Sequence, residues 1–248
     1  MNTQKLPELQ KKYGELDAGD LLQVMIGDVF KNKIALISSF GADAALLLAI
    51  VSEIDNKTPV LFLETGKHFP ETLQYVEALK NKLGLQNLNF LTPDPELLNR
   101  IDEKGDLWNS NPDRCCWMRK VEPLDRAVKE LGIEALITGR KRYQNSERAK
   151  LETIELDDKN IFRINPLANW DKARQKQEAA KRDLPAHPLV AQGYLSIGCA
   201  PCTSIVKAGE DERAGRWRHT AKEDQQKTEC GLHISGLEIR VSGFGEKE

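Results

Sequence analysis

The 248-residue sequence has no long hydrophobic run and no excess of positive charge. Its longest apolar run, residues 44–51, is far too short to span a bilayer. The polar first twenty residues lack the apolar core of a secretory signal. A net charge of −2 excludes a global positive field that would favour nucleic acid or an anionic membrane. We therefore expect a cytoplasmic protein that binds neither nucleic acid nor membrane, and any anion site must be built locally.

Cysteine is scarce too, with five residues in a chain long enough to bury a core without disulfides. A reducing compartment argues against structural disulfides. Cys115 and Cys116 are adjacent, Cys199 and Cys202 form a Cys-x-x-Cys pair, and Cys230 stands alone. This grouping predicts four ligands and one free thiol.

Short apolar runs alternate with helical patterns in the first two-thirds of the chain. The runs predicted as strands are 33–39, 59–64, 87–91 and 134–138. The patterns predicted as helices are 42–54, 70–83 and 113–131. This alternation predicts βαβ units, and hence a Rossmann-like α/β fold with a mostly parallel sheet and helices on both faces.

Two parts of the chain are predicted from this pattern. Residues 1–184 form a nucleotide-binding α/β domain that ends in a charged helix over 170–184. Residues 185–248 form a C-terminal extension over the active site, with a mobile end. Ligands of such sheets bind at the carboxyl ends of the strands, so the site is expected there.

The four paired cysteines suit either zinc or an iron–sulfur cluster. Adjacent residues on a helix diverge by about 100° around its axis. Cys115 and Cys116 therefore reach one object only if that object is large or the helix is distorted, which favours a cubane cluster over zinc. The alternative is a pair of inert, buried cysteines with an incidental Cys-x-x-Cys. Glycine and proline around Cys199 and Cys202, in SIGCAPCT, favour a ligand loop instead.

Three loops after predicted strands are candidate anion sites. SSFGAD (38–43) precedes a helix, whose N-terminus favours an anion, although a plain structural turn is the commoner interpretation of that motif alone. LETGKHFPET (63–72) contains Gly66, which allows close backbone approach. GRKRYQNSERAK (139–150) carries five cations against one acid. A solvated charge run is its alternative, but arginine forks match phosphate and sulfate oxygens.

Two single residues add to these groups. Lys120 lies four positions after Cys116, on the same helix face, where it is equally well a substrate-holding cation or an ordinary surface lysine. Cys230 lies in KTECGLH, where Glu229 is expected to raise its pKa and His233 to lower it. Nearby glycines make this tail easy to move, so its thiol is either a mobile nucleophile or an idle exposed cysteine.

Together these motifs resemble the assimilatory adenylyl-sulfate reductases of bacteria and plants, within the sulfonucleotide reductase family. RCCWMRK, SIGCAPCT, ERAGRW and ECGLH carry the resemblance along with the three loops, over about residues 30–235. It implies an adenine nucleotide alpha hydrolase-like fold and the family branch that binds a 4Fe-4S cluster, here on Cys115, Cys116, Cys199 and Cys202. That branch prefers adenylyl sulfate, and some members also accept the 3′-phosphorylated form.

The resemblance also implies a mechanism for sulfate assimilation. Cys230 attacks the sulfate sulfur, AMP leaves, and a thioredoxin (or glutaredoxin) thiol then releases sulfite from the enzyme thiosulfonate. Lys120 lies between cluster and sulfate, and His233 settles around the thiol. By similarity, the substrate contacts are Ser39, Gly41, Glu64, Thr65, Gly66, Arg142, Arg213 and Arg216.

Two departures and two alternatives accompany this resemblance. Fifteen residues follow His233, whereas ECGLH usually lies very near the C-terminus, and SSFGAD differs from the serine-phenylalanine-serine-glycine order of other members. The alternatives are an ATP pyrophosphatase of the same superfamily, whose phosphate loop needs a serine-glycine-glycine start, and a zinc-binding interaction module without catalysis. The sequence leaves open the reductant, the exclusion of a 3′-phosphate and the oligomeric state, a homo-oligomer included.

Overall fold

A six-stranded sheet of order β3-β2-β1-β4-β6-β5 forms the centre of the computed structural model, which describes residues 2–144, 146–220 and 232. The strands are β1 (Ile34–Ser38), β2 (Val60–Leu63), β3 (Leu88–Leu91), β4 (Ala135–Ile137), β5 (Ile154–Leu156) and β6 (Phe162–Ile164). All pairings are parallel except that of β5 with β6. The predicted α/β fold with a mostly parallel sheet is confirmed.

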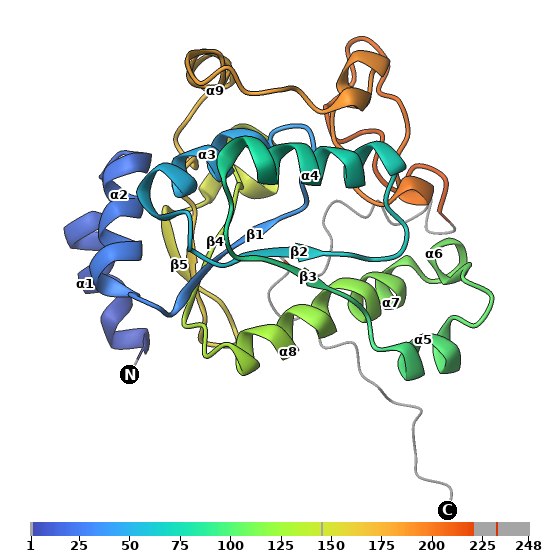
Figure 1. The fold of residues 1–248 in the computed structure, drawn as a ribbon, viewed down its shortest axis with the longest axis horizontal. Coiled ribbons are helices and arrows are strands. Elements are labelled where there is room, and N and C mark those ends of the chain that lie inside the picture. The colour runs from blue at the N-terminus through green and yellow to red at the C-terminus, as the bar shows by residue number, and fades with distance from the viewer. Residues whose placement is uncertain (1, 145, 221–231, 233–248) are drawn as a thin grey trace, which may run out of the picture.

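Helices cover both faces of this sheet, as Figure 1 shows. One face carries α3 (Ala44–Asp55), α4 (Pro70–Leu83) and α9 (Lys172–Lys181), and the other carries α8 (Glu122–Glu130) beneath β2 and β3. The short helices α5 (Pro95–Ile101), α6 (Leu107–Ser110) and α7 (Pro112–Cys116) lead into α8. Alternate residues of β2 face opposite ways, so Phe62 joins the core under α3 while Leu61 and Leu63 join the core above α8.

The N-terminal helices close the β5 end of the sheet. They are α1 (Asn2–Tyr13) and α2 (Ala18–Val24), which continues into a π-helical turn, η1 (Met25–Val29). Gln10 donates a hydrogen bond to the Ile154 carbonyl at 3.0 Å, and the Thr153 hydroxyl donates to the Gly14 carbonyl at 2.8 Å. An edge strand that is covered in this way has few free backbone groups for another chain.

The helix predicted over 113–131 is present, but it is not regular. The segments α7, η2 (Trp117–Val121) and α8 follow one another without a break, and η2 is a π-helical turn. Asn111 caps the start by accepting a hydrogen bond from the Arg114 amide at 3.0 Å. The distortion begins directly after Cys116, and π-helical turns are frequent at functional sites.

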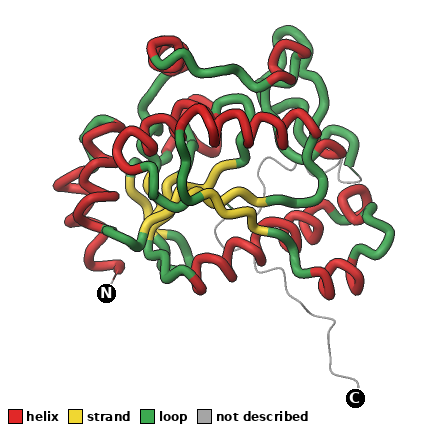
Figure 2. The backbone as a smooth tube through the Cα atoms, in the orientation of Figure 1, coloured by secondary structure: helices red, strands yellow, loops and turns green. Residues whose placement is uncertain are grey.

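After β6 the described chain forms mostly loops, apart from α9, and these loops are drawn green in Figure 2. Short 3₁₀ turns, η5 (Pro188–Gln192) and η6 (Ala200–Cys202), interrupt these loops. Figure 1 shows the orange part of this region over the ends of β1 and β2. Within the described part of the chain, none of the helices combines the length and the apolar character that crossing a bilayer requires.

Candidate functional site

A cavity of about 230 Å³ opens at the carboxyl ends of β1 and β4. Three stretches supply half of its lining: residues 38–39 and 41–44 after β1, 138–141 after β4, and 195–198 from the C-terminal region. Parallel sheets bind ligands at this end, as the sequence predicts. We call this cavity the strand-end pocket.

The loop after β1 is shaped by Phe40, which is fully buried at a positive φ of 47°. Its ring packs edge-on against Phe62, and its amide donates to the Ser38 hydroxyl at 3.1 Å. This turn leaves Ser39 and Gly41 on the lining of the strand-end pocket. A Cβ at Gly41 would lie 3.0 Å from the Ile197 carbonyl, so glycine lets the C-terminal region approach closely.

Cations dominate the strand-end pocket. Its lining includes Lys120, Arg140, Lys141, Arg148, Arg213 and Arg216, against the acids Asp43 and Glu212. The buried Lys141 donates to Asp43 at 2.9 Å, just before the N-terminus of α3. Positive side chains and a helix N-terminus together favour a bound anion.

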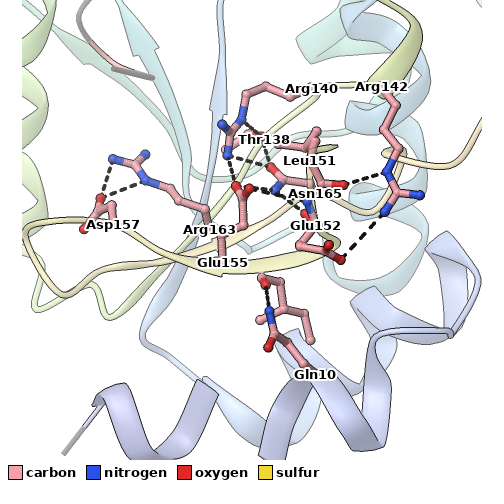
Figure 3. Close-up of polar contacts among 11 residues, drawn as sticks. Gln10, Thr138, Arg140, Arg142, Leu151, Glu152, Glu155, Asp157, Arg163 and Asn165 are labelled. Atoms are coloured by element: carbon pink, nitrogen blue, oxygen red, sulfur yellow. Dashed lines mark hydrogen bonds and ion pairs between the residues drawn. The ribbon is translucent and has the colours of Figure 1, made fainter. Parts of the chain in front are cut away.

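Arg140 is held by a polar network, which Figure 3 shows. Its guanidinium bonds to Glu155 at 2.7 Å and to Asn165 at 3.2 Å, and the Thr138 hydroxyl donates to Asn165 at 2.5 Å. Because Asn165 is fully buried, these bonds tie the ends of β4, β5 and β6 together. The network thereby holds the N-terminal end of the basic loop 139–150 in place.

Arg142 lies elsewhere, although the resemblance implies a substrate contact for it. It donates to the Leu151 carbonyl at 2.7 Å and pairs with Glu152 at 3.7 Å, as Figure 3 shows. It is not part of the strand-end pocket lining. Arg148, from the same basic loop, lines the pocket beside Gln144, to which it donates a hydrogen bond.

The loop after β2 faces the cysteines rather than the strand-end pocket. Glu64 accepts a hydrogen bond from the Gly66 amide at 2.7 Å, so it stabilises its own turn. Thr65 is buried, and its hydroxyl lies 3.3 Å from the Cys199 sulfur. The Thr65 carbonyl accepts from Arg119 at 2.7 Å. Glu64, Thr65 and Gly66 are absent from the strand-end pocket lining, which takes Leu63 and His68 from this stretch.

The structure brings Cys115, Cys116, Cys199 and Cys202 together on the lining of a second cavity. All four are buried, with exposed fractions of 6–7%. Two tryptophans, Trp108 and Trp217, pack beside them. The Ala200 amide donates to the Lys67 carbonyl at 2.7 Å, which ties the Cys-x-x-Cys turn to the loop after β2. We call this second cavity the cysteine cavity.

Burial and mutual repulsion shift the pKa values of these thiols. Burial, with Cys116 adding to it, raises the pKa of Cys115 to about 12. Burial raises the pKa of Cys202 to about 11. Burial acts the same way on Cys199, but Lys120 and Thr65 outweigh it and lower its pKa. Cys199 thus lies next to Lys120, which also lines the strand-end pocket.

The donor set of the cysteine cavity is purely sulfur. Its lining holds four cysteines and three cations, Lys67, Arg119 and Lys120, without any carboxylate. Four buried sulfurs from two chain segments fit the usual ligation of an iron–sulfur cluster. Among the described residues, no three His, Cys, Asp or Glu side chains are placed to hold a single metal ion.

Two predicted catalytic residues, Cys230 and His233, lie outside the described residues. Their neighbour Leu232 is described, and it lines the strand-end pocket. Leu232 also packs against the apolar cluster that includes Leu63 and Leu136. The other predicted contacts on this lining are Ser39, Gly41, Lys120, Arg213 and Arg216.

Sequence reasoning missed several lining residues. Lys141 and Arg140 belong to the basic loop, but nothing in a charge run shows which of its members turn inward. Ser196 and Ile197 begin the SIGCAPCT motif, but the sequence analysis used this motif only for its cysteines. Their position directly before the Cys-x-x-Cys pair was the only available signal.

Comparisons with known proteins agree on one family. Residues 33–205 match the model of the phosphoadenosine phosphosulfate reductase domain. The chain is 48% identical to the adenosine 5′-phosphosulfate reductase of Mesorhizobium japonicum, over 96% of this chain and 91% of that one. It is 37% identical to the phosphoadenosine phosphosulfate reductase of Emericella nidulans, over 79% of this chain and 65% of that one.

Solved structures give the same picture of the fold. The phosphoadenylyl-sulfate reductase of Candida auris superposes with a TM-score of 0.70 at 29% identity, covering 83% of this chain and 98% of that one. Yeast FAD synthetase shares the fold alone, with a TM-score of 0.54 at 15% identity, covering 82% of this chain and 75% of that one. The sequence resemblance is thereby confirmed at the level of the family. This chain belongs to the phosphoadenosine phosphosulfate reductase family.

Proposed function

We propose that this chain reduces adenylyl sulfate to sulfite and AMP, with Cys230 as nucleophile and thioredoxin (or glutaredoxin) as reductant. One observation carries the proposal: the cationic strand-end pocket and the cysteine cavity share Lys120 and Trp217. A substrate anion in the pocket therefore lies beside the four thiols. The Mesorhizobium japonicum relative bears the name of this activity.

The pocket suits a nucleotide with an anionic tail. Ser39, Gly41 and the N-terminus of α3 offer backbone and hydroxyl groups to a phosphate. Arg213 and Arg216 offer guanidinium forks, which match phosphate and sulfate oxygens in pairs. We assign the AMP phosphate to the loop after β1 and the sulfate to the side of Lys120.

Cys115, Cys116, Cys199 and Cys202 would hold a 4Fe-4S cluster in the cysteine cavity. The cluster would supply local charge beside Lys120, so that this lysine is oriented toward the sulfate. The pocket thus polarises the S–O bond through fixed cations in a partly enclosed site.

The reaction then needs two displacements. The Cys230 thiolate attacks the sulfate sulfur, the S–O bond to AMP breaks, and AMP leaves with that electron pair. The product is a cysteine thiosulfonate. A thiolate of the reductant next attacks the Cys230 sulfur, and sulfite leaves with the electrons of the S–S bond. The second reductant thiol resolves the mixed disulfide, so the reductant dithiol is oxidised and the sulfur is reduced by two electrons.

Leu232 supports the role of Cys230, because it lines the strand-end pocket two residues away. Two extended residues span at most about 7 Å of chain. This short chain separation supports Cys230 as the thiol that acts on a nucleotide in the pocket.

Phosphoadenylyl sulfate is the second candidate substrate. The Emericella nidulans and Candida auris relatives are named for it. This nucleotide carries one more phosphate, and the cationic lining of the strand-end pocket suits that extra negative charge. Turnover of each nucleotide under the same conditions decides between the two substrates.

The decisive experiment compares the wild-type protein with Cys230→Ser, each purified without air. We expect the variant to form no sulfite from adenylyl sulfate and thioredoxin, yet to bind AMP and keep a brown iron–sulfur colour. Intact-mass analysis of wild type without reductant should show a sulfonate adduct on Cys230. Full turnover by Cys230→Ser would refute the nucleophile, and a colourless, iron-free wild type would refute the cluster.

A further inference from the structure

Trp217 belongs to both cavities described above, and its backbone is strained. Its residue surface is 6% exposed, and it lines the strand-end pocket as well as the cysteine cavity. Its φ is 55°, in the left-handed region that bulky residues rarely adopt. Such a conformation persists only where the surrounding structure enforces it, and it is concentrated at functional sites. The strain at Trp217 therefore indicates a role beyond packing.

Three hydrogen bonds hold the backbone of Trp217 in this conformation. Its amide donates to the Cys202 carbonyl at 3.0 Å. Its carbonyl accepts from the amide of the buried Thr220 at 3.1 Å and from the Thr220 hydroxyl at 3.0 Å. The Cys-x-x-Cys turn and Thr220 together thus fix the place of the indole ring.

The indole ring lies against two cations of the strand-end pocket. The guanidinium carbon of Arg216 is 4.5 Å from the ring centroid, and that of Arg213 is 5.9 Å away. Both distances are within the range of about 6 Å over which a cation is attracted to an aromatic face. Adjacent side chains of a regular helix or strand do not face each other. The left-handed φ of Trp217 therefore explains how its ring reaches the neighbouring Arg216.

Arg216 is confined by Gly198 as well. A Cβ at Gly198 would lie 2.6 Å from the Arg216 Cζ, so the guanidinium lies close against the Gly198 backbone. Both residues line the strand-end pocket. A guanidinium that is already confined loses less side-chain freedom when it binds an anion, which favours binding.

We propose that Trp217 is a positioning residue, which holds the guanidinium groups of Arg213 and Arg216 in place for the phosphate and sulfate groups of the nucleotide. This inference rests on the proposed function, in which the nucleotide binds in the strand-end pocket. Trp217 acts through the two arginines rather than on the reacting atoms. The property that matters is the face of an aromatic ring, which phenylalanine retains and leucine lacks.

Binding of AMP and of adenosine tests this role without any turnover. Trp217→Leu removes the ring and should weaken AMP binding about tenfold, the effect of losing a desolvated cation–π contact. Adenosine carries no phosphate, so its affinity should stay that of wild type. Trp217→Phe keeps an aromatic face and should bind AMP within about threefold of wild type. Isothermal titration supplies the dissociation constants, and far-UV circular dichroism checks that each variant is folded.

Trp170 provides the matched control, because it makes the same kind of contact elsewhere. It is 5% exposed, and the guanidinium carbon of Arg174 lies 4.1 Å from its ring centroid. Neither residue is among the described lining of the strand-end pocket. Trp170→Leu should therefore bind both AMP and adenosine as wild type does.

Three outcomes would overturn the proposal. One is unchanged AMP affinity in Trp217→Leu. Another is an equal loss of AMP and adenosine affinity in that variant, which would assign Trp217 to the shape of the nucleotide pocket. The third is a tenfold loss of AMP affinity in Trp217→Phe, the variant that changes the packing least. Failure of the proposed function shows in the wild type instead, as AMP binding no tighter than that of adenosine, and it would refute both proposals.

Discussion

At the scale of single residues, the contacts of one buried ion pair connect both halves of the site. Arg119, on the π-helical turn after Cys116, binds Asp102 at 2.5 Å, and the two side chains are 7% and 1% exposed. The same guanidinium donates to the Thr65 carbonyl at 2.7 Å. Asp102 in turn accepts from the Leu107 amide at 2.9 Å. One pair therefore fixes the helix of the cysteines, the loop after β2 and the start of α6.

Asp102→Asn should destabilise the fold strongly, because it leaves the Arg119 charge buried without its counter-ion. Breaking such a pair costs about 3–5 kcal/mol. The exposed Lys82–Asp183 pair provides the matched control, since Asp183→Asn should cost less than about 1 kcal/mol. Urea unfolding measures both, and equal losses in the two variants would contradict a structural role for Asp102.

Gly198 has a different role, because it makes room for a pocket cation. A Cβ at this position would lie 2.3 Å from a terminal nitrogen of Arg216. The contact is with the end of a flexible side chain, so the chain can adjust by moving the guanidinium rather than the backbone. Gly198→Ala should therefore lower AMP affinity about tenfold through lost charge-assisted hydrogen bonds.

The control for Gly198→Ala is Gly19→Ala in α2, where a Cβ meets nothing within 4 Å. It should bind AMP as wild type does and gain about 0.5–1 kcal/mol of stability, because alanine is the better helix residue. Isothermal titration with AMP and urea unfolding supply the two readouts. Unchanged AMP affinity in Gly198→Ala would show that Arg216 does not contact the nucleotide.

At the scale of elements, the sequence predicted the strands and helices that have clear apolar patterns. The runs that became β1 to β4 are hydrophobic, and α4 has both a starting proline and Gly84 at a φ of 61° after its end. Strands β5 and β6 were missed, because each has three residues with a charged one in the middle, whereas the equally short β4 is uniformly apolar. The π-helical turn η2 was also missed, because π-helical turns are rare and leave no clear pattern in the sequence.

For the site, too, the sequence predicted some features and missed others. Grouping of the cysteines in one cavity could be anticipated from their spacing, because paired ligands leave a local signature. The direction in which each basic side chain points could not be predicted from the sequence. Lys141 turns inward to Asp43, while Arg142 turns outward to Glu152, and the two are neighbours in one charge run. Such choices depend on partners that are distant in the sequence.

The contact between α4 and η5 is pH-sensitive through His187. Burial lowers the pKa of His187, with Glu71 opposing this effect. Its Nδ1 accepts from the Leu189 amide at 3.2 Å, and its Nε2 lies 3.0 Å from the Thr72 hydroxyl. Only the neutral ring can accept at Nδ1. The unfolded state therefore binds the proton more readily than the folded state, and stability falls as the pH drops below the unfolded value of about 6.5.

We expect the wild type to lose more unfolding free energy between pH 7 and pH 5 than His187→Gln does, because glutamine has no proton to gain. Urea titrations at the two pH values measure the difference. The prediction fails if both proteins show the same pH dependence. Far-UV circular dichroism at pH 7 checks that the variant is folded.

At the scale of the whole molecule, the site joins parts that are distant in sequence. The strand-end pocket takes its walls from the loops after β1 and β4 and from residues 195–217, and the cysteine cavity joins α7 to η6. The sheet has its own apolar cores on both faces. The buried cluster around the Cys-x-x-Cys turn is much smaller, made of Cys199, Cys202 and Trp217.

Removal of iron from the proposed cluster should therefore loosen the cysteine region and leave the sheet intact. After treatment with a chelator, we expect faster amide exchange in residues 108–120 and 198–217, because metal binding stabilises only the state that binds it. Exchange in β1, β2 and β4 should not change. A uniform rise across the sheet would instead make the cluster part of the global fold.

The order of segments along the chain has a consequence during synthesis on the ribosome. Strand β4 sits between β1 and β6, so the sheet is complete only after residue 164 has emerged. Cys115 and Cys116 are made well before Cys199 and Cys202, and a nascent chain of intermediate length carries two thiols without their counterparts. Assembly of the proposed cluster on all four thiols would therefore follow the point at which the sheet can already form, which would separate folding from metal loading in time.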